Sequence, residues 1–269
     1  MPEGDSLRHA AAAIGPHLVG MRLGAAWLRG IERRELAGRA VRSVEARGKH
    51  LLVAVEGGAT VHVHLGMNGR VRVRPRAEAT VGMARTASLL LATASAAVIV
   101  TRAPVAELLR TPFVEAHHHL SRLGPDLLDG EPDVPAMVRR ARELCAGARA
   151  IADVLLDQRV AAGIGNVYKS EVLFIERLHP LTPLGALDGV ALERLYRRAV
   201  DLMRANLGPW RRTTTADRSR GELPRRGVGR HFVYRRVGRP CYACGAPIET
   251  LRHGDAARVT YFCPSCQRG

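Results

Sequence analysis

Residues 241–266 read CYACGAPIETLRHGDAARVTYFCPSC, with a Cys-x-x-Cys pair at each end. The two pairs, Cys241 with Cys244 and Cys263 with Cys266, are separated by 18 residues, a spacing expected of a four-thiolate zinc site. Four thiolates fill a tetrahedral Zn²⁺, so no position remains for catalysis at the metal. We therefore predict one structural Zn²⁺. Two redox-active dithiols are the less favoured alternative, because no thioredoxin-like βαβ pattern surrounds either pair.

The segment between the two pairs is predicted to form a two-stranded ribbon from residues 247–251 and 258–262. A unit of about 30 residues buries too little apolar surface to fold alone, so the metal would supply its folding energy.

Upstream of this ribbon, the apolar residues repeat at helical spacing. A tight turn, Gly163-Ile164-Gly165-Asn166, lies between two of the expected helices. On its own this turn is a weak signal and would be interpreted as a plain helix–helix connection. The expected helices cover residues 134–145, 151–156, 166–176 and 188–206.

The first part of the chain is predicted to be a helix followed by strands. Residues 6–21 form an Ala-rich helical segment, and short alternating or apolar runs follow it. The turn residues Glu56-Gly57-Gly58 and Asn68-Gly69 predict hairpins between consecutive runs. We therefore expect residues 2–115 to form a helix and an antiparallel β-sandwich or barrel. The expected strands include residues 51–55, 61–65, 71–74 and 98–101.

The charge of the chain points to a polyanionic partner. It has 41 Lys and Arg against 25 Asp and Glu, a net charge of +16 and a pI near 11.0. Nucleic acid is favoured over a membrane surface, because there is no spanning stretch, lipidation motif or basic amphipathic helix. No signal peptide is evident, so a cytosolic location is expected. Residues 204–240 carry eleven arginines and are interpreted as a basic linker near DNA.

Lysine is rare in this chain, since only Lys49 and Lys169 occur beside 39 arginines. A retained lysine can mark a site that needs a titratable amine. The N-terminus can supply another amine, because removal of Met1 would expose Pro2 as a secondary amine with a pKa near ~8. Attack of that amine on a sugar aldehyde carbon would form an iminium ion, with Glu3 as general acid/base. Taken alone, Pro2-Glu3 is more readily read as an ordinary chain start.

Three segments taken in order change that interpretation, because together they resemble the formamidopyrimidine-DNA glycosylase/endonuclease VIII family, with an endonuclease VIII-like character. The resemblance spans essentially the whole chain. The segments are Met1-Pro2-Glu3-Gly4, Leu155-Leu156-Asp157-Gln158-Arg159-Val160-Ala161-Ala162-Gly163-Ile164-Gly165-Asn166-Val167-Tyr168 and the four-cysteine ribbon ending in Gln267. Further matches are residues 47–51, 64–69, 123–126 and 232–236.

This resemblance implies an α+β multidomain fold. The expected parts are an N-terminal catalytic β-sandwich domain with the catalytic helix (residues 2–115), a helix–two-turn–helix domain with the basic linker (residues 125–235) and a zinc-ribbon finger (residues 236–269). It also implies a base-excision repair enzyme, a DNA glycosylase with AP-lyase activity. The expected partner is damaged double-stranded DNA, no membrane is involved, and the chain is expected to act as a monomer.

The family's catalytic residues map onto three positions. Pro2 would attack C1′ of a damaged deoxynucleotide, Glu3 would assist ring opening and base loss, and Lys49 would contact phosphate or assist catalysis. Strand cleavage would follow by β,δ-elimination.

The DNA-binding residues implied by the resemblance lie elsewhere. Asn166, with Gly163 and Gly165, would bind backbone phosphate through amides next to a helix N-terminus. Arg258, in the return strand of the ribbon, would contact phosphates flanking the lesion. Met67 would fill the space that the extruded nucleotide leaves, although a half-buried sheet methionine is an equally good reading of the residue alone.

Departures from the family pattern bear on the substrate. Ser6 stands where the family has a second acidic residue, and Asp5 precedes it. No Arg–Phe pair of the purine-directed branch occurs near residues 101–109, which favours oxidised pyrimidines, whereas the loop His64-Leu65-Gly66-Met67 resembles the purine-directed branch. The alternatives are an oxidised-purine glycosylase, a non-catalytic damage-specific DNA-binding protein on the same fold, and a zinc-ribbon RNA-binding protein.

The histidines are not assigned a site from sequence. The run His117-His118-His119 is interpreted as an exposed or satisfied surface run, because consecutive side chains point in different directions. His62 and His64 share one strand face and are interpreted as sheet or DNA-facing polar residues, with no metal implied.

Overall fold

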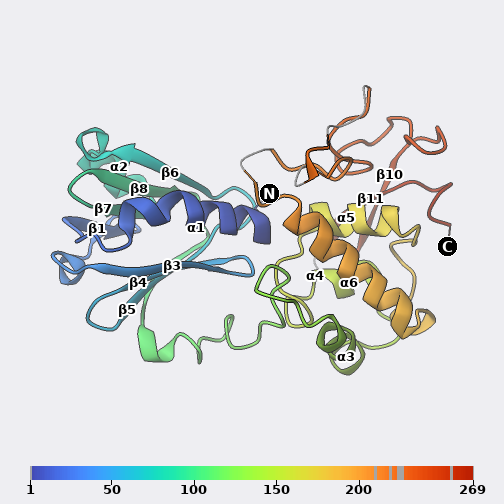
Figure 1. Cartoon of the computed structure of the whole chain (residues 1–269), viewed down its shortest axis with the longest axis horizontal. Coiled ribbons are helices and arrows are strands. Elements are labelled where there is room, and N and C mark those ends of the chain that lie inside the picture. Colours follow the sequence, from blue (N-terminus) through green and yellow to red (C-terminus); the bar gives the residue numbers. More distant parts are fainter. Residues whose placement is uncertain (1, 209–210, 218–219, 223–226, 255–256, 269) are drawn as a thin grey trace. The chain divides into compact units, whose positions relative to one another are not determined.

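The computed structural model describes residues 2–208, 211–217, 220–222, 227–254 and 257–268. The chain divides into two compact units, residues 1–122 and residues 123–269 (Figure 1). Each unit has its own apolar core, and each is described by itself below.

The first unit is a β-sandwich with one long helix, α1 (Gly4–Leu18). One antiparallel sheet has the strand order β2-β1-β7-β8-β6 and the other has the order β3-β4-β5-β9. The strands are β1 (Ala25–Leu28), β2 (Ile31–Glu32), β3 (Val41–Arg47), β4 (His50–Val55), β5 (Ala59–His64), β6 (Arg70–Pro75), β7 (Leu89–Ala92), β8 (Ala96–Thr101) and β9 (Val105–Arg110). The short helices are η1 (Arg34–Leu36), η2 (Arg76–Glu78), α2 (Val81–Thr86) and η3 (Thr111–Phe113).

The sandwich core follows from alternation along the strands. In β4 and β5, every second side chain is apolar and faces the opposite sheet, whereas His50 and His62 lie on the other face. Helix α1 packs along β3 and also contacts β4, β6 and β8, with Leu7, Ile14 and Leu18 fully buried (Figure 1). The predicted helix-plus-sandwich fold is confirmed. The apolar strand residues facing inward include Leu51, Val53, Val61, Val63, Leu89, Leu91, Val98 and Val100.

One predicted hairpin is correct and the other is wrong. Strands β4 and β5 pair across the turn at residues 56–58, as predicted. Strands β5 and β6 do not pair: β5 lies between β4 and β9, while β6 pairs with β8 in the other sheet. The loop of residues 65–69 therefore crosses between sheets. Asn68-Gly69 signals only a tight turn, closed here by the Gly69 amide donating to the Leu65 carbonyl at 2.8 Å.

The second unit combines four α-helices with the terminal ribbon. The helices agree with the predicted ranges to within two residues at either end, because their periodicity is local. They are α3 (Val134–Leu144), α4 (Ile151–Leu156), α5 (Asn166–Ile175) and α6 (Gly189–Arg204), with the short helix η4 (Leu184–Ala186). Their apolar faces meet in one core that includes Met137, Leu155, Tyr168, Leu195 and Tyr196.

The ribbon consists of β10 (Glu249–His253) and β11 (Arg258–Phe262), paired antiparallel, and β11 packs against α5. The first strand begins two residues later than predicted. Within the parts that the structure describes, no helix has both the length and the apolar character needed to cross a membrane.

Part of the arginine-rich segment is anchored to helix α5. The side chain of Glu171 is fully buried and accepts hydrogen bonds from the amides of Phe232, Val233 and Tyr234 at 2.7–2.9 Å. The Thr214 hydroxyl donates to the same carboxylate. Burial raises the pKa of Glu171, and these four donors act in the opposite direction. The described parts of the predicted linker are thus fixed to the helical core.

Candidate active site and nucleic-acid interface

Pro2 lies beside a cavity of about 450 Å³ in the first unit. Pro2 is half-buried at the start of α1, whose first residue is Gly4, and it lines this cavity together with Ser6 and His9 of the same helix. Leu65, Gly69 and Arg70–Val73 complete the wall from the inter-sheet loop and β6. A secondary amine released at Pro2 would therefore face this open cavity.

Glu3 follows Pro2 directly in the chain. It is the N-cap residue of α1, has extended backbone angles and is completely buried. Ser6, which stands where the family has a second acidic residue, lines the cavity. The preceding Asp5 is 2% exposed and accepts a hydrogen bond from the Ser6 hydroxyl at 3.4 Å. The structure places Pro2 and Ser6 on one cavity wall, and Glu3 lies between them in the chain as the N-cap of α1.

His9 is a cavity residue that the sequence did not reveal. It lies on the same face of α1 as Ser6, Ala10 and Ala13, the i, i+3, i+4, i+7 positions of a helix. Its Nε2 is buried and has no hydrogen-bond partner within the described part of the chain. The helical spacing from Ser6 was the signal that could have found it.

Lys49 and Met67 occupy turns of the first unit. Lys49 is half-buried in the β3–β4 hairpin, and its positive charge, after burial itself, lowers the pKa of His64. Met67 is 64% exposed at the tip of the loop whose ends, Leu65 and Gly69, line the Pro2 cavity. A Cβ at position 69 would lie 2.2 Å from the Leu65 carbonyl oxygen, so glycine is required there. The half-buried sheet methionine is therefore excluded, and Met67 projects from a loop.

The predicted glycine turn is held in one conformation by Gln158. Its side chain accepts from the Gly163 amide at 3.1 Å and donates to the Leu156 and Ile164 carbonyls. Gly163 has φ +116°, a conformation that favours glycine. Gly165 is the N-cap of α5 with no side-chain cap, and Asn166 begins the helix. The Asn166 Oδ1 atom is buried and has no partner among the residues described.

The start of this turn is fixed by a buried carboxylate. Asp157 accepts from Arg149 at 2.8 Å and from Arg159 at 2.7 and 2.9 Å. Burial alone would raise the pKa of Asp157, but the hydrogen bonds from both arginines outweigh it and lower the pKa to about 2. Asp157 is therefore ionised at neutral pH and orders the residues that precede Gly163.

The four cysteines converge as predicted. Their sulfur atoms all lie within 4.8 Å of one another, with Cys241–Cys266 at 4.0 Å and Cys244–Cys263 at 3.4 Å. Tetrahedral Zn–S bonds of about 2.3 Å place sulfur atoms about 3.8 Å apart, so this set fits a metal ion. Arg258, the first residue of β11, is exposed.

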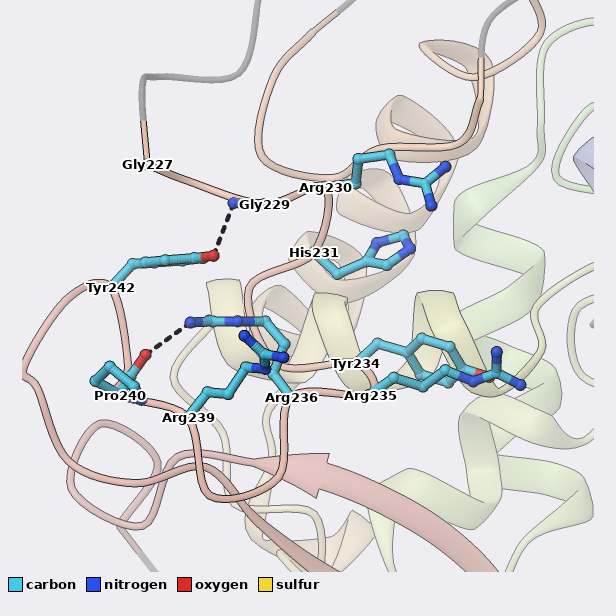
Figure 2. A pocket seen from close by; sticks show the side chains of 10 residues that line it. All are labelled: Gly227, Gly229, Arg230, His231, Tyr234, Arg235, Arg236, Arg239, Pro240 and Tyr242. Atoms are coloured by element: carbon cyan, nitrogen blue, oxygen red, sulfur yellow. Dashed lines mark hydrogen bonds between the residues drawn. The ribbon is translucent and has the colours of Figure 1, made fainter.

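A second cavity, of about 460 Å³, lies in the C-terminal unit and is strongly cationic (Figure 2). Arg236 is buried, stacks over the Tyr242 ring at 3.5 Å and donates to the Pro240 carbonyl at 2.7 Å. Tyr242 in turn accepts from the Gly229 amide. The remaining arginines of the wall are exposed: Arg230, Arg235 and Arg239.

His231 remains neutral inside this cationic wall. Burial, followed by the charges of Arg212, Arg230 and Arg235, lowers the pKa of His231 to about 4. Exposed guanidinium groups next to aromatic rings are suited to phosphate oxygens and bases. The sequence predicted a basic segment here but did not reveal that it folds into a pocket.

Family models match both units of the chain. The formamidopyrimidine-DNA glycosylase N-terminal domain matches residues 1–102, and the formamidopyrimidine-DNA glycosylase H2TH domain matches residues 123–217. The chain belongs to the formamidopyrimidine-DNA glycosylase family. It is thus a DNA glycosylase/AP lyase of DNA repair, as predicted.

Relatives within this family carry names of both the endonuclease VIII and the formamidopyrimidine-DNA glycosylase branches. The chain is 40% identical to "Probable endonuclease 8 2" of Streptomyces coelicolor, covering 100% of this chain and 95% of that protein. It is 38% identical to "DNA-(apurinic or apyrimidinic site) lyase Nei2" of Mycolicibacterium smegmatis, covering 99% of each. Formamidopyrimidine-DNA glycosylase of Thermus thermophilus is 37% identical over 86% of this chain and 83% of that protein.

The fold matches a solved family member. The glycosylase of Lactococcus lactis, in a complex with DNA that contains an abasic site, superposes with a TM-score of 0.80 at 23% identity. The match covers 99% of this chain and 100% of that one. The predicted architecture of sandwich, helical domain and cysteine ribbon is thereby confirmed.

Proposed function

We propose that this glycosylase excises oxidised pyrimidines from duplex DNA through an iminium ion on Pro2 and then cuts the strand by β,δ-elimination. The observation that carries the proposal is the placement of Pro2 at the wall of a cavity with the buried Glu3 beside it. A chain-start amine and a shielded carboxyl are the two groups that this chemistry needs.

Pro2 and Glu3 carry the proposed reaction. The Pro2 nitrogen forms a bond to C1′ of the sugar while the bond from C1′ to the base breaks, and the base leaves with a proton. Glu3 supplies a proton to O4′, so that the C1′–O4′ bond breaks and the nitrogen lone pair forms the iminium ion. The Glu3 carboxylate, which gave its proton to O4′, takes up a C2′ proton as the 3′ phosphate leaves. A second elimination expels the 5′ phosphate, and water then hydrolyses the iminium ion and releases the Pro2 amine. Lys49 is assigned to a phosphate next to the lesion.

DNA binding is assigned to groups in both units. Asn166 and the Gly163–Gly165 amides, Arg258 and the cationic pocket would hold backbone phosphates, and Met67 would enter the duplex when the nucleotide leaves it. A net charge of +16 and a Lactococcus lactis neighbour solved with abasic DNA support this assignment. Another complex of that neighbour contains an oxidised pyrimidine.

The pyrimidine preference is supported by the connection between β8 and β9. Only residues 102–104 join these strands, and they contain no Arg–Phe pair that could occupy the space opposite an oxidised purine. Two relatives are named endonuclease 8, the branch of the family that the sequence resembles.

The metal proposed for Cys241, Cys244, Cys263 and Cys266 is a single structural Zn²⁺. When bound, it would supply folding energy to the ribbon, because a four-thiolate shell has no open position. We propose that the chain acts as a monomer on damaged double-stranded DNA in the bacterial cytosol.

Borohydride trapping tests this function. Protein without a tag is mixed with duplexes that carry an abasic site, thymine glycol or 8-oxoguanine, reduced, and separated on a denaturing gel. We expect a covalent band with the abasic and pyrimidine lesions that disappears when a residue is added before Pro2. Arg34→Ala, at an exposed position in the same unit, is the matched control.

The outcomes separate the alternatives. Faster excision of 8-oxoguanine than of thymine glycol would overturn the pyrimidine assignment alone. Tight DNA binding without a band on any lesion would indicate a damage-specific binding protein, and preferential binding of RNA would favour the zinc-ribbon RNA-binding alternative.

A further inference from the structure

A group of histidines gathers on the outer face of the four-stranded sheet, away from the sandwich core. His50 on β4, His62 on β5 and Glu107 on β9 are neighbours in register: His50 pairs with His64, and His62 pairs with Glu107. The chain after β9 then folds back over this face and brings His117 onto it.

Three of these side chains offer ligand atoms to one point. The Nδ1 atom of His62 lies 2.8 Å from Glu107 Oε1, and the Nε2 atom of His117 lies 3.1 Å from the same oxygen. The ligand atoms of all three residues lie within 4.8 Å of one another. The His62 side chain is 0% exposed and the His117 side chain 10%, so both rings are held in place by their surroundings.

His50 contacts the second ring nitrogen of His62. Its Nδ1 lies 2.8 Å from the Nε2 of His62. Two ring nitrogens at this distance share one proton, so one of them donates and the other accepts. Without a metal, His62 Nδ1 donates to Glu107 Oε1. If His62 Nε2 donates to His50 instead, His62 Nδ1 has a lone pair for an ion that lies between it and Glu107. A metal-binding histidine almost always donates a hydrogen bond from the N–H of its second ring nitrogen.

We propose that His62, Glu107 and His117 bind a divalent transition-metal ion, with His50 as the residue that orients His62. Two imidazoles and one carboxylate form a ligand set that suits Zn²⁺ and other borderline metal ions. Ligand atoms around tetrahedral Zn²⁺ lie about 3.3 Å apart. Glu107 is 39% exposed, and its distances to the two ring nitrogens, 2.8 and 3.1 Å, need to lengthen by only a few tenths of an ångström to reach that spacing.

The ion would fix the end of the first unit to its sheet. Residues 111–122 are already attached at two points: the Thr111 amide donates to the Gly58 carbonyl, and Arg47 pairs with Glu115 at 2.8 Å. Beyond Glu115, His117 is the next side chain that reaches the sheet. A metal bridge from His117 to β5 and β9 would therefore hold the last residues before the second unit.

Metal stoichiometry of the full-length protein tests this site. The protein is equilibrated with excess Zn²⁺, desalted, and its zinc is counted by mass spectrometry. We expect two zinc ions per chain in the unchanged protein and one in Glu107→Gln and in His117→Gln. His118→Gln is the matched control, since His118 is the exposed neighbour in the run and is not part of the ligand set, and it should keep two.

Cobalt substitution identifies which site is lost. Co²⁺ in the cysteine site gives strong sulfur-to-metal charge-transfer absorption, whereas a second equivalent held by nitrogen and oxygen does not. The variants should lose only the second equivalent, which also shows that their ribbon is folded. One zinc ion in the unchanged protein, or two in both Glu107→Gln and His117→Gln, would overturn the proposal.

Discussion

At the scale of single residues, the role proposed for Glu3 predicts different effects on base removal and on strand cleavage. Glu3→Gln removes the proton that O4′ needs for ring opening, so excision of an oxidised pyrimidine should fall by about 10²–10⁴-fold. An abasic sugar already exposes an aldehyde carbon, so trapping of abasic DNA by Pro2 should persist. Single-turnover excision and borohydride trapping on the two substrates measure the difference.

The control for this variant is Glu35→Gln, which changes an exposed carboxylate in the same unit and should leave both rates unchanged. Equal loss of excision and of trapping would remove Glu3 from its assigned role.

Met67 provides a prediction that is independent of stability. Because its side chain is 64% exposed, Met67→Ala should change the free energy of unfolding by less than about 0.5 kcal/mol. Excision from duplex DNA should fall by about tenfold, since nothing then fills the emptied space, whereas cleavage of a single-stranded abasic substrate should be unaffected. Equal losses on duplex and single strands would show that Met67 does not act as a wedge. Met83→Ala, at another exposed methionine of this unit, is the comparison.

At the scale of structural elements, Asp157 ties the end of α4 to the glycine turn. The pKa of folded Asp157 is lowered from 3.8 to about 2, so its stabilisation is present above pH ~4 and is lost as the pH falls through about 2. Asp157→Asn should therefore cost about 2 kcal/mol at pH 7. The difference in thermal midpoint from the unchanged protein should shrink between pH 4 and pH 2. Asp201→Asn, at an exposed position of α6, should show neither the loss of stability nor the pH dependence.

The contacts of Glu171 predict how residues 232–234 are held against α5. Glu171→Ala leaves one buried and two half-buried amides without their acceptor, which should destabilise the second unit by about 3–5 kcal/mol. Hydrogen exchange should show faster exchange at the amides of residues 232–234. Glu193→Ala, on the exposed face of α6, is the control, and unchanged protection in Glu171→Ala would contradict the assignment.

The elements also show what the sequence could and could not predict. Helices α3 to α6 and the cysteine set were predictable, because both depend on spacing within one short segment. The partners of β5 and β6 were not, since Asn68-Gly69 specifies a turn and not which strands pair across it. His62, Glu107 and His117 lie up to 55 positions apart, and only strand register and the fold-back after β9 bring them together.

The cavity around Pro2 was also not predictable from spacing within one segment. Composition and spacing left Pro2 as an ordinary chain start, and only the family resemblance assigned it a role. Its cavity is built from α1, β6 and the inter-sheet loop, and His9 becomes visible only when these elements are in place.

At the scale of the whole molecule, the charge of +16 predicts binding that depends strongly on salt. If six to ten phosphates are contacted, affinity should fall by about 10³–10⁵-fold between about 50 and 200 mM salt. Replacing Arg235 and Arg239 of the cationic pocket by Ala should lower the slope of log Kd against log salt by about 1–2, for damaged and undamaged duplexes alike. Fluorescence anisotropy at several salt concentrations measures it.

Arg34→Ala, at an exposed position paired with Glu32, should leave that slope unchanged. A loss confined to damaged DNA would show instead that the pocket reads the lesion.

The contact between the ribbon and α5 limits how the chain can be divided. Lys169 is fully buried on α5, with its Nζ 3.1 Å from the Val259 carbonyl and 3.3 Å from His253 Nε2, and His253 is held by Asp153 of α4 at 2.8 Å. A chain shortened before Cys241 would leave this ammonium group on bare helix surface without those acceptors. The finger is thus not an interchangeable module. A ribbon transplanted from another protein would need an acceptor at each of these two positions before it could dock here.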